Sequence, residues 1–308
     1  MHAAVVTSFD TPPRYGPHPD PIAGGADEMV VDVLAAGLHQ LVRARANGTH
    51  YSSSATLPSV PGVDGVVRDQ DGKLRYAVLD DTHLGMFAER TVIDRRRSVV
   101  LPGDIDPVRI AAAMNPAMSS WIALRRRITF RAGLRVLVLG ATGTAGRMAV
   151  QIAKQFGAAQ VIAAGRNPAR LAELPSLGAD ETVTFGQADR AADVDVVIDY
   201  VWGEPSARAM TAMLLARRDR STPLDWIQIG SVAGQTIPLD SALLRAARLQ
   251  ICGSGIGSVP AGDIIAELPD LAAAIHSGAI DVRARPVPLA QVAETWNAAT
   301  DERLVYVP

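Results

Sequence analysis

The sequence predicts an α/β protein in which a doubly wound parallel sheet is joined to a β-rich module. Three observations lead to this fold class: strand-like runs fill the first 100 residues, strands alternate with helices from about residue 107, and a strand-like tail ends the chain. Strands that alternate with helices need crossover connections, which build a parallel sheet covered on both faces. The 308 residues suffice for roughly two domains of about 150 residues each.

The first module is expected to be antiparallel and barrel-like. Gly and Pro separate its strand-like runs, and Asp71-Gly72 between the third and fourth runs is typical of a tight hairpin turn, because Gly tolerates a positive φ. The expected strands are residues 3–6, 29–34, 62–68, 74–78 and 85–93.

The rest of the chain alternates strands and helices and then returns to strands. Helices are expected at 107–113, 117–127, 145–156, 168–174, 205–217 and 239–246, and strands at 135–139, 160–164, 194–200, 224–229 and 249–252. The tail has strand-like runs at 280–287 and 304–307 around a helix near 290–298. We therefore expect one domain formed by residues 1–110 and 280–308, and a second formed by residues 111–279.

Composition excludes several classes of protein. A net charge of −2 and a pI near 6.3 disfavour a basic nucleic-acid-binding surface, and only two of the 30 basic residues are lysines, which disfavours a Schiff-base enzyme. The single cysteine, Cys252, excludes an intrachain disulfide and a zinc site built on several thiolates. No signal-peptide pattern opens the chain, and no apolar run approaches the roughly 20 residues that span a bilayer. We expect a cytoplasmic protein without a membrane or nucleic-acid partner.

The strongest local signal is a glycine turn between a strand and a helix. The apolar strand at 135–139 runs into Gly140-Ala-Thr-Gly-Thr-Ala-Gly146, and Met148 and Ile152 then give the helix an apolar stripe. Unpaired N–H groups and the positive end of the helix dipole favour a pyrophosphate at such a turn, although GxxGxxG also occurs as a packing turn. We expect a Rossmann-type dinucleotide site that uses Gly140, Thr142, Gly143, Thr144, Ala145 and Gly146.

The end of the next strand indicates which dinucleotide binds. An NAD site places a carboxylate there for the ribose 2′-hydroxyl, whereas a cation accommodates the 2′-phosphate of NADP. Residues 163–170 contain no carboxylate, and Arg166 lies 20 residues after Gly146. An arginine can contact a phosphate through two N–H groups. We therefore expect NADP(H), held by Gly165, Arg166 and Asn167; a solvated loop arginine is the alternative.

Four motifs follow one another in a defined order: Gly48-Thr-His-Tyr51, Leu57-Pro-Ser-Val-Pro-Gly-Val-Asp-Gly65, Met118-Ser-Ser-Trp121 and Arg303-Leu-Val-Tyr-Val-Pro308. Together with the glycine turn they resemble the medium-chain dehydrogenase/reductase superfamily, and within it the zinc-independent zeta-crystallin-like quinone oxidoreductases. The resemblance covers essentially the whole chain. It implies a GroES-like barrel domain beside a Rossmann domain, and a homodimer paired through an edge strand, for which residues 248–256 are the candidate.

The zinc-dependent members of this superfamily hold a catalytic zinc with two cysteines and a histidine. The matching residues here are His39, Val63 and Asn115, and one histidine beside a valine and an amide cannot make a three-ligand site. The resemblance therefore implies a metal-free, NADPH-dependent reductase that transfers a hydride to an acceptor activated by conjugation, namely a quinone or an α,β-unsaturated carbonyl.

The resemblance also supplies candidate site residues. Tyr51 is the first candidate to donate a hydrogen bond to the substrate oxyanion, a contact worth about 3 to 4 kcal/mol; a tyrosine packed in a loop is the alternative. His39 and Asn115 are brought to the same cleft, and Ser119 matches a threonine near the nicotinamide. The other expected nicotinamide contacts are Tyr200, Gly230, Ser231, Gly253 and Ser254.

Two other functions stay open. An enoyl-thioester reductase would need a basic entrance, for which Arg43 and Arg45 are candidates, although a solvated helix face also explains them. A non-catalytic redox sensor would hold NADPH for a partner to detect. The chain also departs from the family's usual Asn-Pro-acid segment and has His39-Gln-Leu-Val42 instead, so the polarity of the pocket has changed.

Overall fold

The computed structural model describes residues 1–49, 56–80 and 82–308, and these form two compact units. One unit comprises Met1–Asn115 and Ala261–Pro308, and the other comprises Pro116–Pro260. Helix α7 (Ala261–His276) belongs to the first unit, where it packs against β7 (Ser98–Val100). The limits expected from the sequence, 1–110 with 280–308 and 111–279, remain a prediction about the functional domains.

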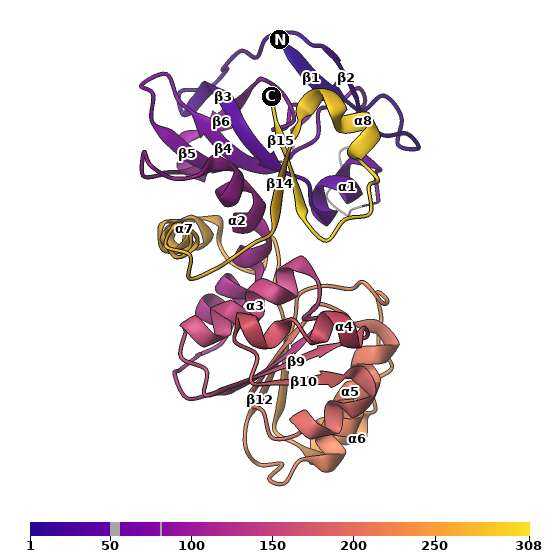
Figure 1. Ribbon diagram of the computed structural model, residues 1–308. Helices are drawn as coiled ribbons and strands as arrows, with labels where there is room; N and C mark the ends of the chain where they lie inside the picture. Colours follow the sequence, from indigo (N-terminus) through magenta and orange to yellow (C-terminus); the bar gives the residue numbers. More distant parts are fainter. Residues whose placement is uncertain (50–55, 81) are drawn as a thin grey trace. The chain divides into compact units, whose positions relative to one another are not determined.

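The first unit is built on a largely antiparallel sheet in the order β14-β15-β3-β4-β5-β7, with β6 on β3 (Figure 1). The last strand pairs with β3, so the tail of the chain completes this sheet. Its other strands and helices are β1 (His2–Val5), β2 (Arg14–Pro17), β3 (Glu28–Gly37), α1 (Gln40–Ala46), β4 (Asp64–Arg68), β5 (Leu74–Val78), β6 (Arg90–Asp94), η1 (Arg95–Arg97), β14 (Ala284–Pro288), η5 (Leu289–Gln291), α8 (Val292–Thr295) and β15 (Arg303–Val307).

The expected hairpin at Asp71-Gly72 is confirmed. Strands β4 and β5 pair antiparallel, with Arg68 opposite Leu74, and Gly72 has φ +78°. That left-handed conformation favours glycine, which has no Cβ to clash.

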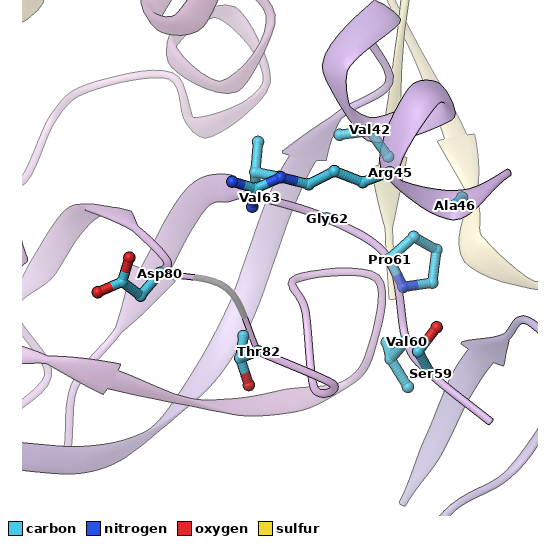
Figure 2. Close-up of a pocket in the computed structure, with 10 residues that line it drawn as sticks. All are labelled: Val42, Arg45, Ala46, Ser59, Val60, Pro61, Gly62, Val63, Asp80 and Thr82. Carbon is cyan, nitrogen blue, oxygen red and sulfur yellow. The ribbon is translucent and has the colours of Figure 1, made fainter. Parts of the chain in front are cut away.

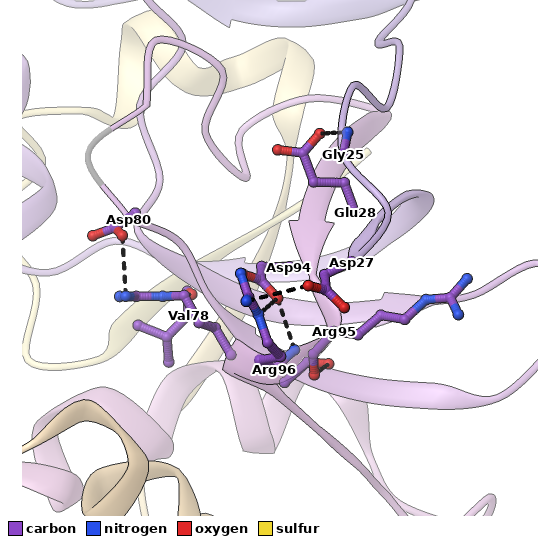
Figure 3. A network of polar contacts seen from close by, with 10 residues as sticks. Gly25, Asp27, Glu28, Val78, Asp80, Asp94, Arg95 and Arg96 are labelled. Carbon is purple, nitrogen blue, oxygen red and sulfur yellow. Dashed lines mark hydrogen bonds and ion pairs between the residues drawn. The ribbon is translucent and has the colours of Figure 1, made fainter.

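A polar network fixes the start of β3 against the end of β6 (Figure 3). The Arg96 guanidinium bonds the Asp94 carboxylate, with Nη2 and Oδ2 2.7 Å apart, and forms an ion pair with Asp27. The hydrogen bond from Arg96 lowers the pKa of Asp94. Nearby, Glu28 accepts a hydrogen bond from the Gly25 amide. The network therefore ties the connection before β3 to the turn after β6.

The second unit is a parallel sheet in the order β10-β9-β8-β11-β12-β13 (Figure 1). The side chains of β8 alternate between its faces: Leu137 and Leu139 share a buried cluster with Met210 and Met213 of α5. The elements of this unit, with the helix that leads into it, are α2 (Pro107–Ile122), η2 (Ala123–Arg127), β8 (Arg135–Leu139), α3 (Thr144–Gln155), β9 (Gln160–Gly165), α4 (Pro168–Leu171), η3 (Leu174–Leu177), β10 (Glu181–Thr184), η4 (Phe185–Ala191), β11 (Val196–Asp199), α5 (Gly203–Ala216), β12 (Leu224–Gln228), α6 (Ser241–Ala246) and β13 (Leu249–Gly253).

The main differences from the expected elements concern two helices. The helices expected at 107–113 and 117–127 are one continuous helix, α2, which contains Pro116 and runs into the π-helical turn η2. Helix α7 was not expected from the sequence. It also carries an internal proline, Pro269. The fold class itself, a parallel sheet with a separate β-rich module, is confirmed.

Candidate functional site

The carboxyl ends of five parallel strands form one edge of the second unit. The pairing register places Leu139 of β8 beside Ala164 of β9 and Asp199 of β11, and it continues through Gln228 of β12 to Gly253 of β13. Ligands of open parallel sheets bind at such an edge. The expected cofactor residues Gly140, Gly165, Tyr200, Gly230, Gly253 and Ser254 lie at or directly after these positions.

The glycine turn after β8 is closely packed at two of its three glycines. Gly140 has φ +85°, and a Cβ there would lie 3.1 Å from a methyl group of Val201. A Cβ at Gly146 would lie 2.2 Å from the carbonyl oxygen of Gly140, which leaves no room for one. These two glycines are therefore required by packing alone. At the exposed Gly143 the nearest atom to a Cβ would be the Gly140 carbonyl oxygen, 3.6 Å away, which is an ordinary contact, so packing does not require a glycine here.

Helix α3 begins at this open position. Its N-cap is Gly143, which has no side chain to cap the helix, and its first turn contains no acidic residue. The N–H groups of that turn therefore have no side-chain cap at the positive end of the helix dipole, and this arrangement suits an anion. A glycine at position 143 is thus explained by anion binding rather than by packing.

Arg166 and Asn167 follow β9 on the exposed surface. Asn167 caps α4, because its Oδ1 accepts hydrogen bonds from the amides of Ala169 and Arg170. Its oxygen is therefore already used by the fold. Gly165, the last residue of β9, is closely packed, because a Cβ there would lie 2.8 Å from the methyl group of Thr142.

Ser119 and Tyr200 form a hydroxyl pair in the second unit. Ser119 Oγ lies 2.9 Å from Tyr200 Oη and also donates to the Pro116 carbonyl at 2.7 Å. Burial raises the pKa of Tyr200 to about 12, so its hydroxyl stays protonated at neutral pH. The structure therefore joins two of the expected cofactor residues that are 81 positions apart.

The sequence did not indicate two features of the segments after β12 and β13: the close packing at Gly230 and the hydrogen bonds from Arg127. A Cβ at Gly230 would lie 2.6 Å from the Tyr200 carbonyl oxygen. Arg127, in the π-helical turn, donates to the Gly253 carbonyl at 2.8 Å and to the Ser258 carbonyl at 3.0 Å. Ser254 is buried, whereas Ser231 is half-buried.

Asp199 was missed as an organising residue. Its buried carboxylate accepts hydrogen bonds from the amides of Val201 and Trp202 and from the Trp226 indole. These bonds hold the turn before α5, in which Trp202 has the unusual φ of +53°. Burial raises the pKa of Asp199. A single aspartate at a strand end has many ordinary roles, so no sequence signal separates this one.

In the first unit, His39 and Asn115 meet at one buried carboxylate. His39 Nε2 lies 2.8 Å from Asp64 Oδ1, and Asn115 Nδ2 lies 3.2 Å from the same oxygen. Val63, the third position matched to a zinc ligand in metal-dependent relatives, is buried and apolar. Tyr51 lies outside the described residues. Within the parts of the chain that are described, no three His, Cys, Asp or Glu side chains gather as a metal site, and no helix is long and apolar enough to cross a membrane.

A pocket in the first unit is lined in part by Val63, the residue that precedes Asp64 in the sequence (Figure 2). Figure 2 shows the Arg45 guanidinium beside Val63 and the Asp80 carboxylate across from it. Arg43 lies on the same helix but has another role, because its Nε and Nη2 donate to the Trp296 carbonyl. Arg43 and Arg45, which were considered together as a basic entrance, therefore have different contacts: Arg45 lines the pocket, whereas Arg43 bonds Trp296. The lining comprises Val42, Arg45, Ala46, Ser59, Val60, Pro61, Gly62, Val63, Asp80 and Thr82.

Comparison with known proteins identifies the family. Residues 145–275 match the family model described as zinc-binding dehydrogenase. A curated protein from Emericella nidulans, named probable NADPH-dependent quinone reductase, is 31% identical over 361 aligned positions that cover 100% of both chains. The chain belongs to the zeta-crystallin-like quinone oxidoreductases of the medium-chain dehydrogenase/reductase superfamily.

Two further likenesses are more limited. An NADPH-dependent alkenal/one oxidoreductase from Arabidopsis thaliana is 28% identical over 194 residues, which are 57% of this chain and 50% of that protein. The solved quinone oxidoreductase of Thermus thermophilus, also determined in complex with NADPH, is 23% identical with a TM-score of 0.84 over 100% of both chains. At that identity the likeness confirms the fold of a Rossmann unit with a GroES-like unit.

Proposed function

We propose that the chain is an NADPH-dependent reductase that transfers a hydride to a quinone or an α,β-unsaturated carbonyl. The observation that carries the proposal is the first turn of α3 at the carboxyl edge, which has no side-chain cap and begins at the exposed Gly143, with an exposed arginine and no carboxylate after the next strand. The curated relatives named as NADPH-dependent quinone and alkenal reductases support this activity.

The residues present fit the dinucleotide. With no side chain at Gly143, a pyrophosphate can approach the N–H groups of Thr144, Ala145 and Gly146, and the exposed Arg166 can extend toward a 2′-phosphate. When bound, the reduced nicotinamide supplies the hydride. The hydroxyl pair of Ser119 and Tyr200 offers hydrogen bonds at the same strand edge, and Gly253 leaves space there.

The residues present do not fit a catalytic zinc. Of the three matched positions, Val63 offers no ligand atom, and the Asn115 amide and the His39 ring are both turned to Asp64. A conjugated acceptor suits this donor set, because the conjugation itself activates the carbon that receives the hydride. We therefore include independence from zinc in the proposal.

The test is the consumption of NADPH, with NADH in parallel, against quinones, alkenals, enones and one enoyl thioester, in buffer containing a metal chelator. We expect NADPH-selective turnover of a quinone or an enone. Turnover confined to the thioester would replace the acceptor class. Tight NADPH binding without turnover of any acceptor, by protein shown to be folded, would favour a redox sensor and overturn the proposal.

We also propose that two copies pair through β13. Among the described strands, β13 ends the parallel sheet and pairs only with β12, which leaves an edge that a second copy can extend. Light scattering at micromolar concentration tests this part separately, and the mass of a monomer would contradict it. The single cysteine, Cys252, suits a reducing compartment such as the cytoplasm.

A further inference from the structure

Asp64 collects hydrogen bonds from three parts of the first unit. It opens β4 and is only 1% exposed. Its Oδ1 lies 2.8 Å from His39 Nε2 and 3.2 Å from Asn115 Nδ2, and its Oδ2 lies 2.8 Å from the hydroxyl oxygen of Tyr76. No motif or comparison above assigns a role to this carboxylate.

The three contacts fix where the protons lie. An ionised carboxylate only accepts hydrogen bonds, so it is satisfied by three donors at once. Burial and the Asp64 charge raise the pKa of Tyr76 well above its usual value, so this hydroxyl remains a donor. The Asn115 amide nitrogen is a donor in any state. His39 must therefore carry a hydrogen on Nε2, and Nδ1 is the ring atom left for proton transfer.

His39 Nδ1 is not used by the fold. The residue is the N-cap of α1, yet its side chain caps none of the helix N–H groups. Among the described residues Nδ1 has no hydrogen-bond partner, and 5% of the side chain is exposed. Nδ1 is thus left unbonded by these residues, whereas Nε2 on the opposite side of the ring is anchored by Asp64.

Two cations lie near this cluster without bonding Asp64. Arg303 donates from Nη1 to the Leu38 carbonyl at 2.8 Å, and burial lowers its pKa to about 10 although the Asp64 charge opposes this. Arg43 is held by the Trp296 carbonyl. Of the three groups that bond Asp64, His39 is the one with a second ring nitrogen that can carry a hydrogen while the first stays bonded to this carboxylate.

We propose that Asp64 is the positioning residue for His39, and that His39 Nδ1 delivers the proton that completes the reduction. The inference rests on the proposed function. The acceptor gains a hydride with its two electrons at carbon, and the resulting oxyanion takes the proton from the imidazolium. The Nδ1–H bond breaks, an O–H bond forms, and the neutral imidazole regains a proton from water. Asp64 stabilises the charged ring and holds Nε2, which leaves Nδ1 for the proton transfer.

The kinetic test uses His39→Ala with and without free imidazole. We expect kcat to fall by about 10²- to 10⁴-fold, the usual contribution of general acid–base catalysis, with NADPH affinity unchanged and part of the rate restored by imidazole. His276→Ala is the matched control, because His276 pairs with Asp104 in the same unit but is exposed, and its kcat should stay that of the parent. Unchanged kcat in His39→Ala would overturn the inference.

The second test needs neither cofactor nor substrate. Nitrogen-15 NMR of protein labelled at its six histidines, with the His39 signal assigned by its loss in His39→Ala, should show the hydrogen on Nε2 of the neutral ring. Asp64→Asn should disturb that signal and not the signal of His276. A hydrogen on Nδ1 instead would overturn the inference. A parent enzyme that reduces no acceptor would instead refute the proposed function, so the two failures are distinguishable.

Discussion

Arg166→Asp reverses the charge at the position that we assign to the 2′-phosphate. Arg166 is exposed, and residues 163–170 contain no carboxylate that would already repel a phosphate. The substitution removes a charge-assisted contact worth about 1.5 kcal/mol at an exposed site and adds a repulsion of about 1.5 kcal/mol between a carboxylate and a dianion some 5 Å apart in water. The total of about 3 kcal/mol corresponds to about a hundredfold loss of preference for NADPH.

The assay is the ratio of kcat/KM for NADPH to that for NADH, measured at two ionic strengths. The ratio should fall by about a hundredfold at low salt and by less at high salt, because screening weakens both electrostatic contributions. Arg208→Asp on α5 is the matched control, since it makes the same change of charge at another exposed arginine of the second unit. A ratio in Arg166→Asp equal to that of the control would refute the assignment of Arg166.

Four further substitutions test the second and first units. Gly146→Ala places a Cβ 2.2 Å from a carbonyl oxygen and should destabilise the fold by about 1–3 kcal/mol, whereas Gly143→Ala should leave the denaturation midpoint unchanged and weaken NADPH binding in a fluorescence titration. Tyr200→Phe removes the hydroxyl pair with Ser119 and should lower the free energy of unfolding by about 1 kcal/mol in urea. The lowered pKa of Asp94 stabilises the fold above the ordinary aspartate pKa and stops doing so as pH falls through the lowered value, so Asp94→Asn should lower Tm at about pH 7 but not at about pH 2.

Much of the fold could be predicted because hydrophobic period and glycine placement are local properties. Strands β5 and β8 have the predicted limits, and α3 begins and ends one residue earlier than predicted. The short strands β2 and β7 were also missed, but the two missed helical features share a cause. Pro116 and Pro269 interrupt the helical pattern in the sequence, yet both lie inside continuous helices, where the loss of one N–H is outweighed by packing of the rest.

The candidate site could be predicted only in part, because only some of its features are set by residues that are neighbours in the sequence. The glycine turn and the residues at the strand ends are set by local sequence and by the rule that ligands bind at the carboxyl edge. The bond between His39 and Asp64 joins residues 25 positions apart, and no periodicity links them. The role of Asp199 depends likewise on the Trp226 indole, which reaches it from a neighbouring strand.

The central claim is that the chain transfers a hydride from NADPH to carbon. The most direct measurement follows an enone reduced with NADPH that carries deuterium at the transferable position of the nicotinamide, with mass spectrometry of the product. We predict one deuterium on the β-carbon of the saturated ketone, and a second label at the α-carbon only when the solvent is heavy water. A product that carries no deuterium from the labelled cofactor would contradict the account.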